Sequence, residues 1–581
     1  MNTNFFNLFE NDFLALFPEI FLISSTIFLL MYGVILSTSK NYNYPILMKN
    51  MGWLSLLTLG LTLCLLLNNP IHQSLLFYNT LIIDDFTYFF KILLLSSSFC
   101  AILISFDLSY DKDQTHQRFL SSNSETVQRK SSPLNAFEYM IFILFSTASM
   151  LFMISSYDFI SMYLTVELQS LCFYVLAASK RNSEFSTEAG LKYFILGAFS
   201  SGILLFGCSM IYGFTGITNF GELAKVLTGS QEVVLNVLSN SGNVEESSLW
   251  SGRSSGIIIG IIFIAVGFLF KLTAAPFHMW APDVYEGSPT AITAFFSIAP
   301  KIAIFGVFLR LFLYSFYDFM LPWQKIIVFC SIASMIVGAL AAMSQHKIKR
   351  LLAYSSIGHI GYILLGLCCA TIEGIEALFI YLIVYVIMTI NLFAIILSLQ
   401  ELRSYNHLTI ESGKDIKGGD SQDYLGEVTL RPAEQNSLNP VQENTQSSGT
   451  YHIKYISDLG MLAKTNPILA LTLTCTLFSM AGIPPLAGFC SKFYIFFAAL
   501  SSSLYLLAFI GVLTSVISCF YYIRLIKIMY FEKPTRFIAY QPMDKEKSIL
   551  IGLTLFFMIF FFFYPSPLFL VAHKVAISLS L

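Results

Sequence analysis

The sequence predicts an all-α, polytopic membrane protein of about fourteen transmembrane helices, and three observations support this fold class. The 581-residue chain is 56% hydrophobic and 12% charged, whereas about a quarter of the residues in an ordinary soluble domain are charged. Its apolar stretches reach the roughly 20 residues that a helix needs to cross a bilayer. Its Lys and Arg residues gather in alternate loops, as they do in membrane proteins of fixed orientation. The lipid bilayer is therefore its first expected partner.

Fourteen apolar segments are candidate spans. We expect helices over residues 15–37, 51–69, 87–108, 136–155, 157–179, 188–213, 256–284, 289–314, 321–343, 350–371, 373–400, 465–498, 502–526 and 548–572. With these spans, most of the 33 basic residues lie on one side of the membrane. Only five lie on the other side: Lys225, Arg253, Arg310, Lys325 and Lys574. This bias predicts that both termini face the side poor in basic residues. Met1–Asp12 contains no Lys or Arg, so we expect neither a transit peptide nor a signal region.

Prolines and glycines interrupt two of the predicted helices. The seventh contains Pro276, and the twelfth contains Pro484 and Pro485. Proline removes a backbone donor and clashes with the preceding turn, so both helices should break there. Broken helices at matching places in two halves are typical of a transport site. Because helices four to eight and nine to thirteen number five each, we predict two inverted repeats, each broken in its fourth helix. We expect His278 and Trp280 to pack against and cap the first break.

This order divides the chain into four parts. They are an N-terminal three-helix segment with a polar loop (1–135), a first repeat (136–314), a second repeat with a polar insertion at 402–457 (321–526), and a C-terminal helix (527–581). Polar stretches lie at about 112–132, 220–255 and 402–456. The last of these is low in aromatic residues, which favours a flexible insertion, with docking of a partner as the alternative.

Four ionisable side chains lie near the middle of apolar spans: Glu167, Lys271, Lys301 and Lys492. Each costs roughly 2.5 to 3.5 kcal/mol there, which favours a role in handling charge. We expect Glu167 to pair with Lys271, because a nearby carboxylate holds an amine protonated and its removal lets the amine lose a proton. A packing ion pair is the alternative. Lys301 lies too deep to reach either interface easily. Lys492 is a candidate proton carrier or a cap on a half-helix.

The remaining candidates are weaker. His359, well inside a continuous helix, is either a satisfied core residue or a proton relay between the central lysine and Lys492. Lys192 lies about one turn into its helix, where it either reaches the interface or assists transfer. Asp283 and Glu286, in a short loop, are candidates to collect protons at the basic face. Lys91 lies just inside the third predicted helix and has no assigned role.

The sequence contains no motif that indicates several other classes of function. The ten cysteines lie inside hydrophobic runs without a CxxC or Cys/His cluster, so we expect no disulfide, metal ligand or iron–sulfur ligand. No GxGxxG or GxxxxGK[ST] motif is present, so we expect no nucleotide cofactor. The net charge of −2 and the absence of a basic patch exclude a nucleic-acid partner. We expect the 30 tyrosines mainly at lipid-facing and interfacial positions.

Three segments carry a resemblance to a known family. TVELQSL, FKLTAAPFHMWAPDVYEGSPTAITAFFSIAPKIAIFGVF and SMAGIPPLAGFCSKF resemble subunit 2 of mitochondrial NADH:ubiquinone oxidoreductase (complex I) and its bacterial counterpart. The resemblance implies an antiporter-like, proton-pumping membrane-arm subunit without its own redox centre. It matches Glu167 and Lys271 to the family's Glu–Lys pair, Lys301 to its central lysine, Lys492 to its terminal lysine and His359 to a histidine between them.

The resemblance also implies partners and a location. Other complex I membrane-arm subunits would be its neighbours, and NADH, FMN, iron–sulfur clusters and ubiquinone would bind in partner subunits. The implied location is the mitochondrial inner membrane, with both termini toward the intermembrane space; a bacterial plasma membrane is the alternative, and a chloroplast relative a further one. A subunit of a multisubunit cation/proton antiporter and a scaffold with purely structural buried charges are the other interpretations.

Overall fold

The protein is described here by a computed structural model. The described residues are 11–37, 45–71, 73–105, 137–180, 183–228, 244–401, 451–452, 454–532 and 543–580. The polar stretch at 112–132 and nearly all of 402–456 lie outside these residues, and the stretch at 220–255 is described only at its two ends.

The described chain is built almost entirely of helices. The long helices are α2 (Phe17–Ser37), α3 (Pro45–Leu67), α4 (Asp85–Ser105), α6 (Glu138–Ser155), α7 (Phe159–Ala177), α8 (Glu184–Thr215), α10 (Val244–Lys271), α12 (Thr290–Arg310), α13 (Met320–Met343), α14 (Ile348–Cys369), α15 (Ile372–Ser398), α19 (Tyr505–Phe531) and α20 (Lys545–Phe563). The shorter ones are α11 (Trp280–Gly287), η2 (Leu311–Ser315), η3 (Tyr317–Phe319), η4 (Ile456–Leu459), α16 (Leu462–Thr465), α17 (Pro467–Ala481), α18 (Ala487–Ser501) and α21 (Ser566–Ser580).

Each predicted span corresponds to a helix or to a pair of helices. The seventh is split into α10 and α11, and the twelfth into α17 and α18, so both predicted breaks are confirmed, each in the fourth helix of its set of five. Among the described residues, twelve helices are long and apolar enough to cross a membrane. Fourteen crossings therefore remain a prediction. The last span was predicted as one helix, which is wrong: α20 ends at Phe563 and α21 follows, because Pro565 interrupts the helix between them.

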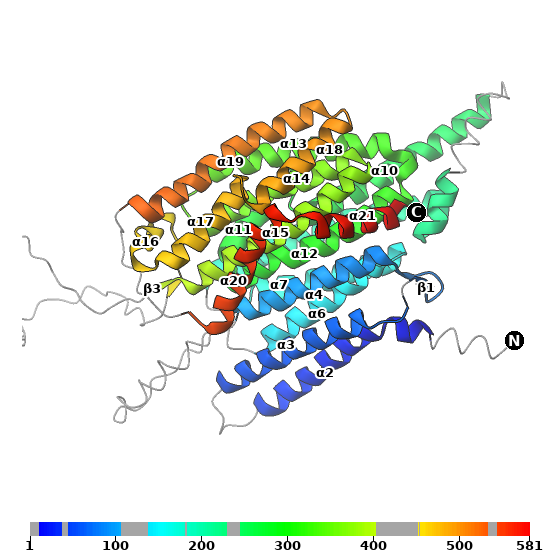
Figure 1. Cartoon of the computed structure of the whole chain (residues 1–581). Helices are drawn as coiled ribbons and strands as arrows, with labels where there is room; N and C mark the ends of the chain where they lie inside the picture. The colour runs from blue at the N-terminus through cyan, green and yellow to red at the C-terminus, as the bar shows by residue number, and fades with distance from the viewer. Residues whose placement is uncertain are drawn as a thin grey trace, which may run out of the picture.

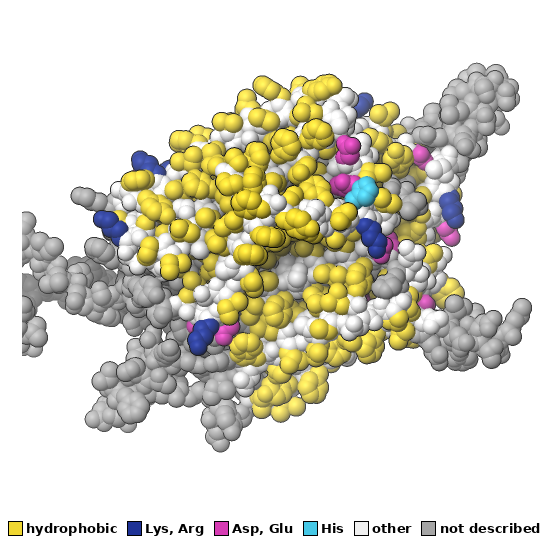
Figure 2. All heavy atoms as spheres, viewed as in Figure 1, with side chains coloured by type: hydrophobic (Ala, Val, Ile, Leu, Met, Phe, Trp, Pro, Cys, Tyr) yellow, Lys and Arg dark blue, Asp and Glu magenta, His cyan; other side chains and the backbone are white. Residues whose placement is uncertain are grey.

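The most deeply buried helices lie at the centre of the bundle. The apolar window of α12 is 100% buried, those of α15 and α14 are 94% and 89% buried, and those of α2 and α20 are only 28% buried. In Figure 1, the blue and cyan helices α2 to α7 lie on one side of α12 and the orange helices α18 and α19 on the other. Figure 2 shows apolar side chains across the middle of one face and charged side chains toward its two ends. The centre is thus the place most shielded from lipid and water.

One end of the bundle brings distant parts of the chain together. An unpredicted hairpin, β1 (Ser74–Leu76) paired antiparallel with β2 (Leu81–Ile83), connects α3 to α4. Its turn is held by Asp12, whose carboxylate accepts from the Phe77 backbone N–H at 3.1 Å. Lys574 of α21 pairs with Asp85 at 3.2 Å. Figure 1 shows the start of α2 and the end of α21 toward this end, whereas β3 (Gln400–Glu401), paired with β4 (Tyr451–His452), lies at the opposite one.

Candidate functional site: a line of buried amines

The first helix break leaves its lysine unattached. Helix α10 ends at Lys271, and Thr273 follows with φ +66°, a strained value for a β-branched residue. The indole of Trp280 donates to the carbonyl of Phe270 at 3.0 Å, so the predicted cap on this break is confirmed for Trp280. Lys271 Nζ is buried and has no hydrogen-bond partner. Its amine is therefore free to interact with whatever enters the adjoining space.

The second break attaches its lysine firmly. Helix α17 ends before Gly482, whose φ of +88° suits glycine, and α18 begins at Ala487. Lys492 reaches back from α18, and its Nζ donates to the carbonyls of Met480 and Ala481 at 2.9 and 3.0 Å. These are carbonyls that a helix end leaves without partners, and a cation is favourable there. Lys492 thus makes the contacts of a helix cap, which is one of the two roles that the sequence predicted for it.

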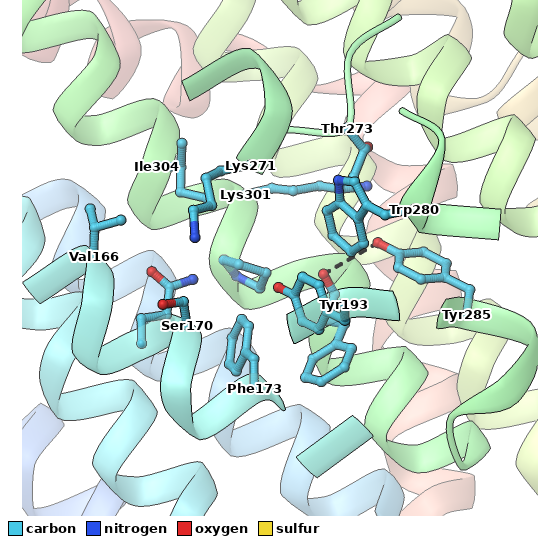
Figure 3. A pocket seen from close by; sticks show the side chains of 13 residues that line it. Val166, Ser170, Phe173, Tyr193, Lys271, Thr273, Trp280, Tyr285, Lys301 and Ile304 are labelled. Carbon is cyan, nitrogen blue, oxygen red and sulfur yellow. Dashed lines mark hydrogen bonds between the residues drawn. The ribbon is translucent and has the colours of Figure 1, made fainter. Parts of the chain in front are cut away.

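A small cavity connects the first lysine to the central one. It has a volume of about 20 Å³, enough for one water molecule. Its wall includes Lys271 at the end of α10, Lys301 in α12, Ser170 in α7 and Trp280 in α11. Figure 3 shows both lysines at the cavity wall, with Ser170 on one side and Trp280 on the other. The structure therefore brings together two amines that are 30 positions apart in the sequence.

The predicted Glu167–Lys271 contact is not made. Glu167 Oε2 accepts from the Ser170 hydroxyl at 3.2 Å, while its Oε1 is buried without a partner, as is Lys271 Nζ. Glu167 still lies close enough for its charge to act on Lys271. The direct ion pair expected from the sequence is not formed between these two described residues. The Ser170 hydroxyl, one turn along α7, lies closer to the Glu167 backbone carbonyl, at 2.9 Å, than to the Glu167 carboxylate, so it restrains the carboxylate only weakly. The two groups remain neighbours with unused bonding capacity.

The central lysine contacts a hydroxyl group and no carboxylate among the described residues. Lys301, only 3% exposed, donates from Nζ to the phenol oxygen of Tyr385 at 2.7 Å. The Tyr385 hydroxyl donates in turn to the carbonyl of Ser297 at 3.3 Å. Burial disfavours the charged form of an amine that has only neutral partners. Lys301 is therefore a buried amine whose hydrogen-bond partner among the described residues is a neutral hydroxyl.

A buried histidine, His359, lies beside Tyr385. His359 Nδ1 lies 2.7 Å from the hydroxyl of Tyr381, and its Nε2 lies 3.1 Å from that of Tyr522. The ring centroids of His359 and Tyr385 are 5.4 Å apart. A second cavity, of about 10 Å³, is lined by His359, Tyr522 and Lys492. The predicted position of His359 between Lys301 and Lys492 agrees with this geometry.

The presence of tyrosines at this site was not predicted from the sequence. Tyr381, Tyr385 and Tyr522 are fully buried, so the expectation that tyrosines face lipid or the interface is wrong for these three. A signal was present: Tyr381 and Tyr385 lie one turn apart in an otherwise apolar helix, which places both on one face.

Comparison with known proteins identifies the family. The model for the transmembrane region of NADH:quinone oxidoreductases and Mrp antiporters matches residues 156–412 and 441–518. The chain is 57% identical over 575 residues to NADH-ubiquinone oxidoreductase chain 2 of Marchantia polymorpha, covering 99% of this chain and 100% of that one. The chain belongs to this family. NADH-quinone oxidoreductase subunit N of Parvibaculum lavamentivorans is 38% identical over 569 residues, covering 98% of each chain.

Solved structures agree on the fold of this family. A chain of respiratory complex I from Thermus thermophilus superposes with a TM-score of 0.66 at 22% identity, covering 96% of this chain and 99% of that one. A chain of the Mrp complex from a Dietzia species superposes with a TM-score of 0.68 at 18% identity, covering 98% and 97%. At these identities the likeness concerns the fold alone.

The candidate accessory residues of this family member form an ion-pair network at the basic face. Asp283 contacts Lys192 of α8 at 3.0 Å and Arg350 of α14 at 2.7 Å. Glu286 pairs with Lys347 and lies 3.3 Å from Arg350. The two carboxylates therefore tie α11, part of the first broken helix, to α14 of the second set of helices. Whether they also collect protons stays a prediction.

Two further buried ion pairs lie outside the predicted set. Lys91 in α4, 2% exposed, contacts Glu19 in α2 at 2.6 Å. Arg310 at the end of α12 contacts both carboxylate oxygens of Asp84, at 2.9 and 2.7 Å. The first pair joins two N-terminal helices to each other, and the second joins the start of α4 to the core helix α12. All ten cysteines are free thiols, and the described residues contain no group of three or more potential metal ligands from His, Cys, Asp and Glu.

Proposed function

We propose that this chain is a proton-translocating membrane subunit of a respiratory NADH:ubiquinone oxidoreductase. Protons would move through Glu167, Lys271, Lys301, His359 and Lys492, while electrons pass through partner subunits that hold NADH, FMN, iron–sulfur clusters and ubiquinone. One observation carries this proposal: Lys271 and Lys301 line the same cavity, and Lys301 donates at 2.7 Å to Tyr385, whose ring lies 5.4 Å from that of His359. Full-length relatives named as chain 2 of this enzyme support the assignment.

Glu167 and Lys271, at the start of the proposed proton pathway, are suited to control when a proton is released. Lys271 Nζ and Glu167 Oε1 are both without a hydrogen-bond partner, so both are available to bond when side-chain movement brings them together. With the carboxylate close, Lys271 keeps its proton; with the carboxylate on Ser170, the amine releases it more easily. A water molecule in the cavity would carry that proton to Lys301.

The residues between Lys301 and Lys492 are suited to pass a proton from one side chain to the next. A tyrosine hydroxyl both donates and accepts, so it can pass a proton on without holding a charge. Tyr385 accepts from Lys301 and donates to the Ser297 carbonyl, and its ring lies 5.4 Å from that of His359, so its hydroxyl must change partners to pass a proton to His359. Tyr522 and the smaller cavity lead from His359 toward Lys492. Lys492 is the last amine of the line, stabilised by two helix-end carbonyls.

The location of the protein is inferred from its relatives. Plant mitochondrial chain 2 proteins and bacterial subunit N proteins align along nearly the whole chain. We infer a location in the mitochondrial inner membrane with both termini toward the intermembrane space. The two pumping repeats would span 136–314 and 321–526, flanked by the parts at 1–135 and 527–581.

The Lys301→Met variant tests the proposal. Methionine has a similar volume and no titratable group, so the complex should assemble and oxidise NADH while its proton yield per electron falls close to zero. The proton yield is measured in reconstituted vesicles, and assembly on a native gel. Lys325→Met is the matched control, because Lys325 is an exposed residue at the start of α13. A full proton yield from assembled Lys301→Met complex would overturn the proposal.

The Tyr385→Phe variant tests the relay. It keeps the buried ring and removes the hydroxyl that accepts from Lys301. We expect proton transfer to slow by about tenfold or more, in line with the loss of one positioned proton-transfer group. Tyr505→Phe, at an exposed position, is the control. An unchanged proton yield and rate in Tyr385→Phe would show that protons bypass this hydroxyl.

A cation/proton antiporter subunit is the second candidate, because the family model and the fold are shared with Mrp antiporters. Purification separates the two. Co-migration with a flavin- and iron–sulfur-containing assembly that oxidises NADH supports the first candidate. Sodium/proton exchange by an isolated complex without flavin supports the second.

A further inference from the structure

Two hydroxyl groups lie beside Lys492, between α14 and α19. The amine of Lys492 lies 5.2 Å from the centre of the Tyr362 ring, and the Tyr362 hydroxyl lies 3.2 Å from that of Thr514 in α19. The Thr514 hydroxyl also donates to the carbonyl of Gly511, one turn away, at 3.0 Å. Tyr362 and Thr514 are both buried. Polar groups therefore continue from Lys492 into the space between these two helices.

A phenylalanine ring packs beside this pair of hydroxyls. Phe496 stands one turn after Lys492 in α18, and its ring meets the Tyr362 ring edge-on, with the two centroids 6.0 Å apart. On its other side the ring lies against Gly511, where an added Cβ would be 2.6 Å from a ring carbon of Phe496. Glycine at position 511 therefore makes room for the ring. The Phe496 ring spans the distance between α14 and α19, next to the Tyr362–Thr514 pair.

Phe496 lies along α18 between Lys492 and the end of the bundle that carries the β1–β2 hairpin (the hairpin end). Helix α18 runs toward that end, where Ser501 in its last turn donates to the carboxylate of Glu373 at 3.1 Å. Glu373 is exposed in the first turn of α15. The ion pair of Glu376 with α21 places this turn of α15 at the hairpin end. Beyond the ring, α18 thus reaches an exposed carboxylate.

An apolar ring at this position is suited to control the access of water to Lys492. The cavity of about 10 Å³ that Lys492 and Tyr362 line has room for about one water molecule. Hydrophobic constrictions stop ions by excluding water, and the path opens when the constriction widens. The ring of Phe496 makes apolar contacts with Tyr362 and Gly511, so it can turn away from them without breaking a hydrogen bond.

We propose that Phe496 is a gate through which protons leave Lys492 toward the hairpin end. With the ring between Tyr362 and Gly511, the exit is closed. When the ring turns away, water enters and takes one proton from the ammonium of Lys492, which leaves a neutral amine, and the proton passes to the solution at the hairpin end. The gate rests on the proposed function, because it requires Lys492 as a proton carrier.

The Phe496→Ala variant of the intact complex, reconstituted in sealed vesicles, tests the gate. A pH gradient is imposed without NADH, and the passive flow of protons is followed with a pH-sensitive dye. We expect a leak about tenfold faster than in wild type, as for a barrier lower by about 1.4 kcal/mol. NADH oxidation should continue with a lower proton yield per electron. Phe497→Ala is the matched control, because Phe497 is the next residue of α18 and is 59% exposed.

The Thr514→Cys variant tests the same closure with Phe496 in place, so it decides the matter even if Phe496→Ala does not assemble. A charged methanethiosulfonate reagent is added at the hairpin end, and the modified residue is located by mass spectrometry. We expect the thiol to react about tenfold faster during NADH oxidation than at rest, as for an open state that rises from about 1% to about 10%. Ser503→Cys, at an exposed position between α18 and α19, should react equally fast in both conditions.

Three results would overturn the gate. One is a wild-type leak and proton yield in assembled Phe496→Ala, and another is a Thr514→Cys thiol that reacts equally fast at rest and during turnover. The third is a Phe496→Ala leak that persists when Lys492→Met is added, since the ring would then close a general pore. Failure of the proposed function is a separate result: it is a full proton yield from Lys301→Met, whereas a normal leak in Phe496→Ala beside a non-pumping Lys301→Met contradicts the gate alone.

Discussion

The two helix breaks have the same architecture but cap their free carbonyls with different groups. At the first break the indole of Trp280 covers the Phe270 carbonyl, and Lys271 has no partner. At the second break, Lys492 itself covers two carbonyls. The comparison teaches that a lysine beside a broken helix is free to change partners only where another group has taken over the capping.

Matching the breaks position by position explains this difference. When Pro276 is aligned with Pro484, Lys271 falls opposite Ser479 and Trp280 falls opposite Gly488. The Ser479 hydroxyl accepts from the Gly488 backbone N–H at 3.0 Å, so α18 lies directly against the end of α17. No side chain fits at position 488, which leaves the capping of the second break to Lys492.

Gly488→Ala should have the largest effect on this comparison. A Cβ at Gly488 would lie 1.8 Å from the Ser479 carbonyl oxygen and 2.6 Å from its carbon, so the backbone must shift. We expect a loss of about 3 kcal/mol or more of stability, as for severe overpacking, and little subunit in the membrane by immunoblot. Gly552→Ala, with nothing within 4 Å of its Cβ, is the control. Normal accumulation of Gly488→Ala would show that the two half-helices are not rigidly joined.

Neutralising the two lysines should separate their roles. Lys492→Met leaves two buried carbonyls without a donor and should cost about 2 to 4 kcal/mol of stability. Lys271→Met loses no hydrogen bond and should be neutral or slightly stabilising, since an unpartnered buried amine is removed. Both variants should lose proton transfer. Thermal unfolding of the solubilised complex measures the difference. Equal destabilisation by both would remove the distinction between a free and an anchored lysine.

Trp280→Phe should destabilise the protein less than Gly488→Ala or Lys492→Met. Phenylalanine keeps a ring against Tyr193, whose stacked partner in the native protein is the Trp280 indole at 4.6 Å, but it cannot donate to Phe270. We expect a loss of about 1 kcal/mol, measured by the same thermal unfolding, with Tyr505→Phe as the control. If a drop in proton yield accompanies this small loss, the cap also positions Lys271. An unaltered melting temperature would mean that the Phe270 carbonyl finds another donor.

The sequence predicted the helices and their breaks well because both depend on local properties. Apolar length sets the spans, and Pro276 and Pro484 lie close to the two observed breaks, whereas Pro300 lies within the continuous helix α12. The contacts of the buried charges depend on residues far along the chain, which periodicity does not reveal. Lys301 meets Tyr385, 84 positions away, and Lys91 meets Glu19 in another helix. Glu167 was assigned to Lys271 on chemical complementarity, yet its carboxylate contacts the nearby Ser170 hydroxyl.

The small size of the two cavities has a consequence for electrical leakage. A membrane potential of 100 mV drives each proton with about 2.3 kcal/mol, and an unbroken column of water across the protein would discharge it. The two cavities of about 20 and 10 Å³ have room for about one water molecule each, and Tyr385 and the ring of His359 lie between them. On the proposed pathway, charge therefore crosses the centre in discrete steps between side chains. Small cavities would slow each proton transfer, and they would also prevent protons from leaking across the membrane between pumping cycles.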